Sequence, residues 1–175
     1  MTSTRRGLLI VNTGDGKGKS SSAFGVMLRA VARDWRVAVI QFIKSDKWRT
    51  GEKDMAVKLG VDWVVGGDGF TWESEDMEAT IVAARDAWDR ARGMILSGDY
   101  DLIILDEATY PVTFSWIAVD EVLEVLRSRP SHVNVVITGR DADPAIVDLA
   151  DTVTEMRKVK HAFDEGIQAR RGLDY

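Results

Sequence analysis

The segment Asn12 to Ser21, NTGDGKGKSS, places three glycines and two lysines within ten residues. Glycines let successive backbone N–H groups turn toward an anion, and a helix that follows adds the partial positive charge of its N-terminus. The usual phosphate-binding pattern, G-x-x-x-x-G-K-[ST], would begin at position 13. This sequence has Thr13 there and its glycine at Gly14 instead. The segment predicts a phosphate-binding loop, and the alternative is a surface turn with solvated lysines.

The second half of the pattern indicates which groups would act on a nucleotide. Lys19 is placed to reach phosphate oxygens, and Ser20 is placed to reach Mg²⁺. Gly16 and Lys17 are additional to the pattern. The candidate nucleotide-binding residues of the loop are Gly14, Asp15, Gly16, Lys17, Gly18, Lys19, Ser20 and Ser21.

Two further polar signals follow apolar runs. Asp106 and Glu107 come directly after LIIL, so they are expected at the carboxyl edge of a central strand, where they could hold Mg²⁺ directly or through water. The candidate metal site is therefore Ser20 with this acidic pair, although an acidic pair also commonly just ends a strand. Arg140 follows another apolar run and could neutralise phosphate charge at the same edge, or form a surface salt bridge.

Short β-branched runs alternate with helical segments along the chain. The expected strands are LLIVN (8–12), RVAVIQF (36–42), VDWVV (61–65), DLIILD (101–106), NVVIT (134–138) and TVTEM (152–156). Runs this apolar suit strands buried on both faces of a parallel sheet. Alternating strands and helices predict an α/β fold with a doubly wound, mostly parallel sheet flanked by helices.

The clearest helix is expected from Glu75 to Leu96. A mixed apolar stripe with charged flanks is expected along it, formed by Ala79, Val82, Ala83, Asp86, Arg90 and their neighbours.

Composition limits the possible classes. At 175 residues, 45% hydrophobic and 29% charged, the chain fits one compact domain over residues 1–175. No run approaches the roughly 18 apolar residues of a membrane helix, and the apolar run near the N-terminus is too short for a signal peptide, so we expect a cytoplasmic protein without membrane contact. A net charge of −5 argues against nucleic acid as a partner. The absence of cysteine excludes thiolate metal sites and a cysteine nucleophile.

An aromatic pair lies between the second expected strand and the long helix. Phe70 and Trp72 are two residues apart, which puts both rings on one side of an extended segment. Three glycines shortly before them indicate a mobile approach. From the residues alone, core packing is the alternative.

Together these segments resemble one known family. TGDGKGKSS-AFG, VIQFIK, GFTWE, LDE-TY, ITGR and the C-terminal KHAFDEGIQARRGLDY look like the P-loop type of ATP:corrinoid adenosyltransferase, in order from about residue 8 to Tyr175. The resemblance implies a P-loop NTPase-like fold in which the loop holds ATP in the reverse of the usual sense. It also implies that Co(I) of a corrinoid attacks the 5′ carbon of ATP and expels triphosphate, forming adenosylcobalamin or its precursor.

The resemblance assigns further roles. The loop amides, Lys17, Lys19 and Mg²⁺ would stabilise the leaving triphosphate. The expected catalytic residues are Lys19, Phe70 and Trp72. Phe70 and Trp72 would bind the corrinoid, displace its lower axial ligand and so make Co(I) attainable by a cellular reductant. The tail, residues 157–175, would complete the site. The expected partners are ATP and corrinoid as substrates, an electron-donating reductase or flavoprotein, and a second copy of the chain in a homodimer.

This sequence differs from the family pattern at several places, and two other classes of function stay open. Asp15 stands where the family often has Asn, so its carboxylate must turn away from the triphosphate or meet a lysine. Few residues precede the first expected strand, so either the site stays open or a partner subunit covers it in place of an N-terminal segment. A P-loop ATPase or phosphotransferase would share the loop and LDE, and a non-catalytic corrinoid carrier would share the aromatic pair. His132 and His161 are expected to be structural.

Overall fold

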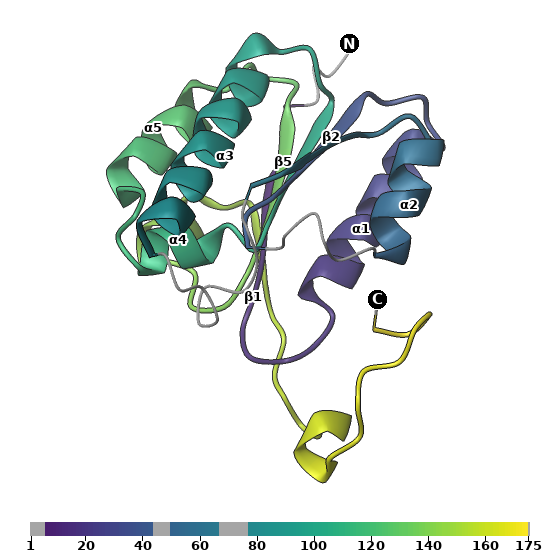
Figure 1. The fold of residues 1–175 in the computed structure, drawn as a ribbon. Coiled ribbons are helices and arrows are strands. Elements are labelled where there is room, and N and C mark those ends of the chain that lie inside the picture. Colours follow the sequence, from purple (N-terminus) through teal and green to yellow (C-terminus); the bar gives the residue numbers. More distant parts are fainter. Residues whose placement is uncertain (1–5, 44–49, 67–76, 175) are drawn as a thin grey trace.

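The computed structural model describes residues 6–43, 50–66 and 77–174. At its centre is a six-stranded sheet in the order β3-β2-β4-β5-β1-β6, in which each neighbouring pair of strands is parallel (Figure 1). The strands are β1 (Leu9–Thr13), β2 (Val37–Gln41), β3 (Asp62–Val65), β4 (Leu102–Asp106), β5 (Asn134–Thr138) and β6 (Thr152–Glu155). The six strands predicted from the sequence are confirmed, and their ends agree to within one residue.

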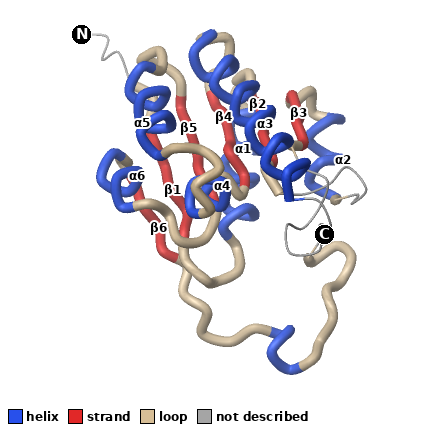
Figure 2. Tube along the Cα trace, turned by 60° about the vertical axis from the view of Figure 1, so that its left-hand side comes forward, coloured by secondary structure: helices blue, strands red, loops and turns tan. Residues whose placement is uncertain are grey.

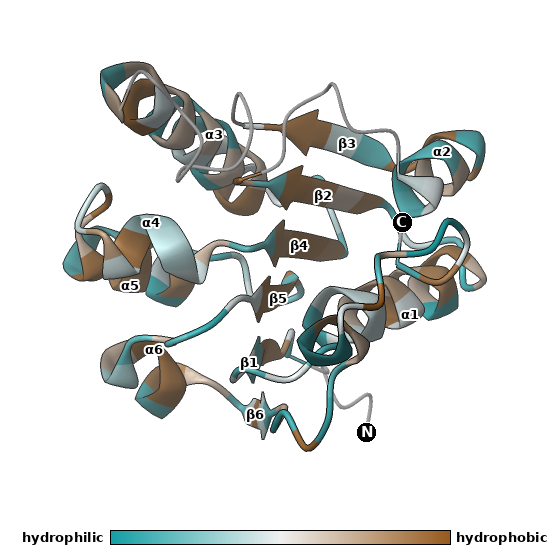
Figure 3. Ribbon diagram, turned by 60° about the horizontal axis from the view of Figure 1, so that its bottom comes forward, coloured by the Kyte–Doolittle hydropathy of each residue, from teal (hydrophilic) through white to brown (hydrophobic). Residues whose placement is uncertain are grey.

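Helices cover both faces of the sheet, as the end-on view shows (Figure 3). One layer contains α1 (Lys19–Val31) and α2 (Gly51–Lys58). The opposite layer contains α3 (Met77–Ser97), α4 (Thr109–Thr113), α5 (Val119–Ser128) and α6 (Pro144–Leu149). This doubly wound α/β arrangement confirms the predicted fold class. Within the described ranges, no helix has the length and apolar character needed to cross a membrane.

Each layer of helices encloses its own hydrophobic core, and β4 contributes to both. Ile103 and Leu105 belong to the core under α3 and α5, whereas Leu102 and Ile104 belong to the core under α1. Successive side chains of a strand point to opposite faces. An uninterrupted apolar run is therefore what a central strand between two helical layers requires.

The two edge strands depart from the expectation of full burial. β2 and β4 are buried at every residue, but β6 is exposed at every residue and β3 is exposed or partly exposed along its length. The expectation was wrong for these two strands, because an edge strand has a neighbour on one side only and lies where the helical layers end.

The long helix is confirmed, but its predicted buried stripe was wrong. Val82, Asp86 and Arg90 are exposed. The buried face lies one to two positions further along the helix and consists of Thr80, Ala84, Ala87, Trp88, Ala91 and Ile95. Trp88 explains the difference, since the largest apolar side chain of the helix packs into the core while its Nε1 donates a 2.6 Å hydrogen bond to Glu121 of α5.

An aspartate joins β1 and β6 at the edge of the sheet where the strands begin. Asp151, directly before β6, accepts a 2.9 Å hydrogen bond from the backbone N–H of Leu9 and is also hydrogen-bonded to the guanidinium of Arg6. The Arg6 hydrogen bond, followed by that of Leu9, lowers the pKa of Asp151 below its ordinary value. The folded chain therefore favours the ionised carboxylate at this position.

Candidate nucleotide-binding site

The predicted loop lies between β1 and α1, at the edge of the sheet where the parallel strands end (Figure 1). Gly18 is the N-cap of α1, with φ at +117°, a left-handed conformation that favours glycine. Thr13, at the position where the usual pattern has glycine, accepts a 3.2 Å hydrogen bond from the backbone N–H of Ala142. Its side chain therefore ties the start of the loop to the connection between β5 and α6.

Lys19 turns back over the loop. Its side chain is almost fully buried, and Nζ donates to the carbonyl oxygens of Gly14 at 2.7 Å and Gly16 at 2.8 Å. Burial lowers the pKa of Lys19, with a smaller opposing effect from the negative charge of Glu107. The two carbonyls take two of the three ammonium donors, so the third can point to a bound anion.

Gly16 packs against the chain that leaves β6. Its N–H donates to the carbonyl of Met156, and a Cβ at Gly16 would lie 2.6 Å from that same oxygen. The closest contacts of real Cβ atoms are longer than 3.0 Å. Gly16 is therefore required by a backbone contact, in addition to any contact with phosphate.

Asp15 lies near an arginine, and its negative charge also acts on Lys19. Arg140 Nη1 lies 3.9 Å from Asp15 Oδ1, with both side chains largely exposed. These two residues line a polar cleft beside the loop together with Glu155, Arg157 and Lys158. Arg140 therefore lies at the predicted edge of the sheet, next to the loop.

The acidic pair ends β4 as predicted. Asp106 has no exposed surface, and its two carboxylate oxygens accept hydrogen bonds from Gln41 Nε2 and Thr138 Oγ1, both at 2.8 Å. Glu107 follows with a left-handed φ of +59°, and its N–H donates to Thr138 Oγ1 at 3.0 Å. The pair is thus held by the ends of both neighbouring strands.

The charge of Glu107 acts on two residues of this edge. It raises the pKa of Lys19 against the larger effect of burial, and it adds to burial in raising the pKa of Tyr110. Lys19 belongs to the loop and Tyr110 to α4, so the charge of Glu107 acts on both of these elements. The sheet therefore brings the loop, the acidic pair and Arg140 together.

Ser20 and Ser21 lie in the first turn of α1, next to Lys19, with Ser20 partly buried and Ser21 exposed. Among the residues that the structure describes, no group of three His, Asp or Glu side chains is arranged to hold a metal ion. A Mg²⁺ ion at Ser20, Asp106 and Glu107 would therefore need oxygens from a bound nucleotide, as is common for Mg²⁺. Phe70 and Trp72 lie outside the described residues.

The tail, described here over residues 157–174, loops outward from β6 through the short helix η1 (Ala162–Glu165) and returns toward α1 (Figure 2). Near its end, Asp174 accepts hydrogen bonds from Lys17 Nζ and from the backbone N–H of Arg170, the latter at 2.7 Å. The Lys17 hydrogen bond is the main reason that the pKa of Asp174 is lowered. The tail thus contacts the loop directly.

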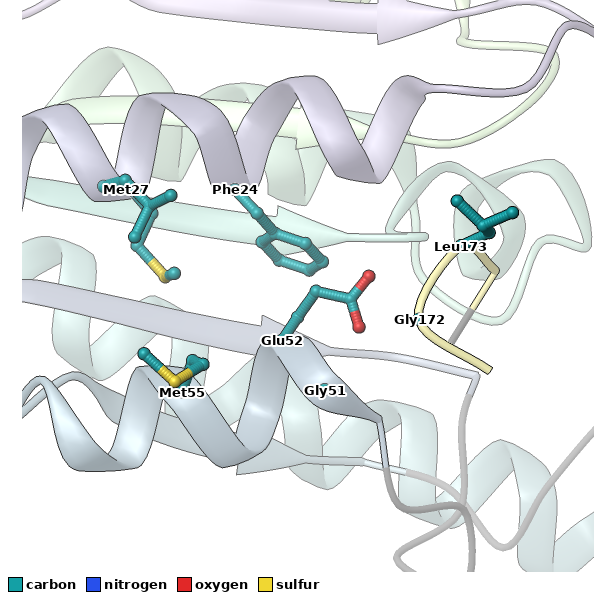
Figure 4. A pocket seen from close by; sticks show the side chains of 8 residues that line it. Phe24, Met27, Gly51, Glu52, Met55, Gly172 and Leu173 are labelled. Atoms are coloured by element: carbon teal, nitrogen blue, oxygen red, sulfur yellow. The ribbon is translucent and has the colours of Figure 1, made fainter. Parts of the chain in front are cut away.

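Leu173 extends this contact to an apolar groove between α1 and α2 (Figure 4). The groove is lined by Phe24 and Met27 from α1 and by Met55 from α2, with Leu173 beside the end of the groove nearest Phe24. The last described residues of the tail therefore lie against the layer of helices that begins at the loop.

Sequence reasoning missed several residues of this edge. Gln41 and Thr138 are the last residues of two buried strands, and a polar side chain in that place was the signal that could have found them. Arg157 and Lys158 begin the tail, shortly after the last strand, and line the cleft. Tyr110 lay within a recognised motif but was given no role.

A parallel sheet with helices on both faces, and a glycine-rich loop between its first strand and first helix, define a P-loop type of nucleotide-binding α/β protein. The flagellar accessory protein FlaH of Methanocaldococcus jannaschii is similar in fold, with a TM-score of 0.56 over 86% of this chain and 71% of that one. At 10% identity this likeness concerns the fold alone.

Sequence comparison narrows this class. Residues 5–175 match the family model of ATP:corrinoid adenosyltransferase BtuR/CobO/CobP, to which the chain therefore belongs. It is 44% identical over 170 residues to the corrinoid adenosyltransferase of Escherichia coli K12 and 45% identical to the corrinoid adenosyltransferase CobA of Salmonella typhimurium LT2, in each case over 97% of this chain and 86% of the relative. The corrinoid adenosyltransferase of Pseudomonas aeruginosa is 42% identical over 172 residues. The family resemblance inferred from the sequence is confirmed.

Proposed function

We propose that this chain transfers the 5′-deoxyadenosyl group of ATP to Co(I) of a corrinoid and releases triphosphate. The observation that carries the proposal is the family match over residues 5–175, which includes the loop, the acidic pair and the tail. Cobalt of the substrate forms the new bond to the 5′ carbon, and the carbon–oxygen bond to the triphosphate breaks. The protein therefore needs no nucleophile of its own, and its work is to position both substrates and stabilise the leaving group.

The leaving triphosphate gains negative charge at the loop. We propose that Lys19, Lys17 and Arg140 neutralise this charge, with the amides of Gly14, Gly16 and Gly18 as further donors. One preorganised donor of this kind is worth about 10²–10³ in rate. The burial of Lys19 supports its role, because burial disfavours the charged ammonium and a bound phosphate oxygen would stabilise it.

Mg²⁺ is proposed to accompany ATP, with Ser20, Asp106 and Glu107 as the residues that would hold it. When bound, the ion would neutralise part of the phosphate charge. Asp106 is completely buried and Glu107 is partly buried, so Glu107 would be the more accessible of the two carboxylates. The donor set fits, since hydroxyl and carboxylate oxygens are the ligands that Mg²⁺ prefers.

Phe70 and Trp72 are proposed to bind the corrinoid and displace its lower axial ligand, which makes Co(I) easier to reach by reduction. This role rests on the family motif GFTWE. Apolar rings would also keep water away from a strongly reducing metal. An electron-donating reductase or flavoprotein is proposed as the partner that supplies the electron.

A homodimer in the cytoplasm is the proposed form of the protein, with the tail completing the site. Four large apolar side chains of the tail, Val159, Phe163, Ile167 and Leu173, are more than 40% exposed, which supports an intermolecular contact.

The test is an anaerobic assay with ATP, Mg²⁺ and chemically reduced cob(I)alamin. Triphosphate released in step with a light-sensitive alkylcorrinoid is the expected result, and Lys19→Ala should lower the rate by about 10²–10³. ADP and orthophosphate with an unchanged corrinoid would instead indicate a P-loop ATPase or phosphotransferase. Binding of the corrinoid without turnover of ATP would indicate a corrinoid carrier.

A further inference from the structure

A buried chain of hydrogen bonds joins the ends of three adjacent strands beneath the loop. Gln41 ends β2 and donates to Asp106 Oδ2 at 2.8 Å, while Thr138 ends β5 and donates to Asp106 Oδ1 at 2.8 Å. The exposed fractions of Gln41, Asp106 and Thr138 are 2%, 0% and 0%. Each carboxylate oxygen therefore has a donor of its own from a different neighbouring strand.

Thr138 has a second role in this chain. The same hydroxyl oxygen accepts the 3.0 Å hydrogen bond from Glu107 N–H, at the residue where the backbone turns left-handed. A hydroxyl group can donate and accept at once, which neither an aliphatic side chain nor an ammonium group can do. One atom of Thr138 thus fixes both the plane of the Asp106 carboxylate and the turn that directs Glu107.

Thr138 also leads into Arg140 through a constrained glycine. Gly139 has φ at +143°, and its N–H donates to the carbonyl of Asn12 at 3.2 Å. A Cβ at Gly139 would lie 2.0 Å from Thr109 Oγ1, so the backbone is closely packed here. Gly139 therefore fixes the backbone between Thr138, which holds the acidic pair, and Arg140.

We propose that Thr138 and Gln41 are positioning residues that hold Asp106 and Glu107 in the orientation in which the pair receives the Mg²⁺ of bound ATP. This inference rests on the proposed function. If either donor is lost, a buried carboxylate oxygen loses its hydrogen bond, and the carboxylate turns toward the donor that remains. Removing such a partner of a metal-binding carboxylate typically lowers metal affinity about 10- to 100-fold.

The test compares Thr138→Val, which keeps the side-chain shape but removes the hydroxyl, with Thr138→Ser, which retains it. Binding of ATP is measured by calorimetry once in Mg²⁺ and once in EDTA. We expect Thr138→Val to weaken the binding of ATP in Mg²⁺ about 10- to 100-fold and to leave the binding of metal-free ATP unchanged. Thr138→Ser should restore the wild-type affinity, and Thr138→Val should need correspondingly more Mg²⁺ for full activity.

The outcomes separate this inference from the proposed function. Equal losses in Mg²⁺ and EDTA would show that Thr138 has a general structural role, and no loss in either would show no role, so both results overturn the inference. A wild-type chain that binds ATP under neither condition would overturn the proposed function itself. Circular dichroism checks folding, and if Thr138→Val does not fold, Gln41→Leu tests the same carboxylate from its other oxygen with the same expected difference.

Discussion

At the scale of single residues, a glycine of the loop can be required by phosphate binding or by close packing within the protein. A sequence pattern does not distinguish these two reasons. Gly16 was predicted to bind phosphate because glycine-rich loops do so. In the structure its Cα also faces the carbonyl of Met156 with no room for a Cβ. A loop glycine can therefore be required by protein packing as much as by a ligand.

Gly16→Ala tests this contact. The added Cβ would lie 2.6 Å from Met156 O, so the loop or the start of the tail must move and the Gly16 N–H hydrogen bond must weaken. We expect a lower melting temperature without ATP and weaker binding of ATP, measured by thermal unfolding and calorimetry. Gly25→Ala is the matched control, because nothing lies within 4 Å of its Cβ position and it sits inside α1. That change should stabilise the protein by up to about 1 kcal/mol. Equal melting temperatures for the two variants would contradict the role of the Met156 contact.

Residue types predicted which candidate residues lie close together, but not the hydrogen bonds between them. The loop, the acidic pair and Arg140 follow apolar runs, and parallel strands bring such positions to one edge. The hydrogen bonds of Asp106 to Gln41 and Thr138 could not be read from the sequence, because they depend on which strands are neighbours. The order of strands in the sheet differs from their order in the chain, with β4 between β2 and β5.

At the scale of elements, the strands were predictable because short runs rich in β-branched residues favour the extended conformation. The buried face of α3 was harder to predict, since several alanines on different sides of the helix make its pattern ambiguous. Trp88 and Ile95 are the large apolar side chains of its buried face. Burial of the edge strands was overestimated for β3 and β6, whose position in the sheet follows from long-range pairing. The local sequence pattern thus predicted where strands and helices form, whereas the neighbouring elements determined which of their residues are exposed.

The junction of β1 and β6 gives a pH-dependent prediction. Because Arg6 and Leu9 hold the pKa of Asp151 below its ordinary value of 3.8, the ionised form stabilises the folded chain above that value. This stabilisation is lost as the pH falls through the lowered pKa. Asp151→Asn should therefore lower the urea midpoint at pH 7, and the difference from wild type should shrink below pH 3.8.

The control is Asp148→Asn, at an exposed aspartate of α6 close by in sequence. Its urea midpoint at pH 7 should stay near that of wild type. A difference between Asp151→Asn and wild type that persists unchanged at the lowest pH would show that the ionised carboxylate is not responsible.

At the scale of the whole molecule, the tail runs outward from β6 and its end returns to the loop. Its outward part is exposed, while Asp174 near its end and Met156 just before its start both contact the loop. Because the Lys17–Asp174 pair is an exposed ion pair, its strength should fall with ionic strength. The docking of the tail is therefore adjustable by conditions that leave the sheet intact.

Asp174→Asn should release the end of the tail. Trypsin can cleave after Arg170 and Arg171, and we expect faster cleavage in this variant because the hydrogen bonds of Asp174 to Lys17 and Arg170 are weakened. Added salt should speed cleavage of the wild type toward the rate of the variant. Asp164→Asn is the control, since Asp164 pairs with Lys158 inside the tail and not with the loop. Equal cleavage of wild type and Asp174→Asn at low salt would argue against docking through this residue.

The parallel sheet also has a practical consequence. All six strands begin at one edge and end at the other, so the candidate site lies opposite the turn that contains the exposed Ser131, just before β5. The sequence has no cysteine. Ser131→Cys would therefore supply a unique thiol by which the molecule can be immobilised on a gold electrode with its substrate-binding edge facing the solution.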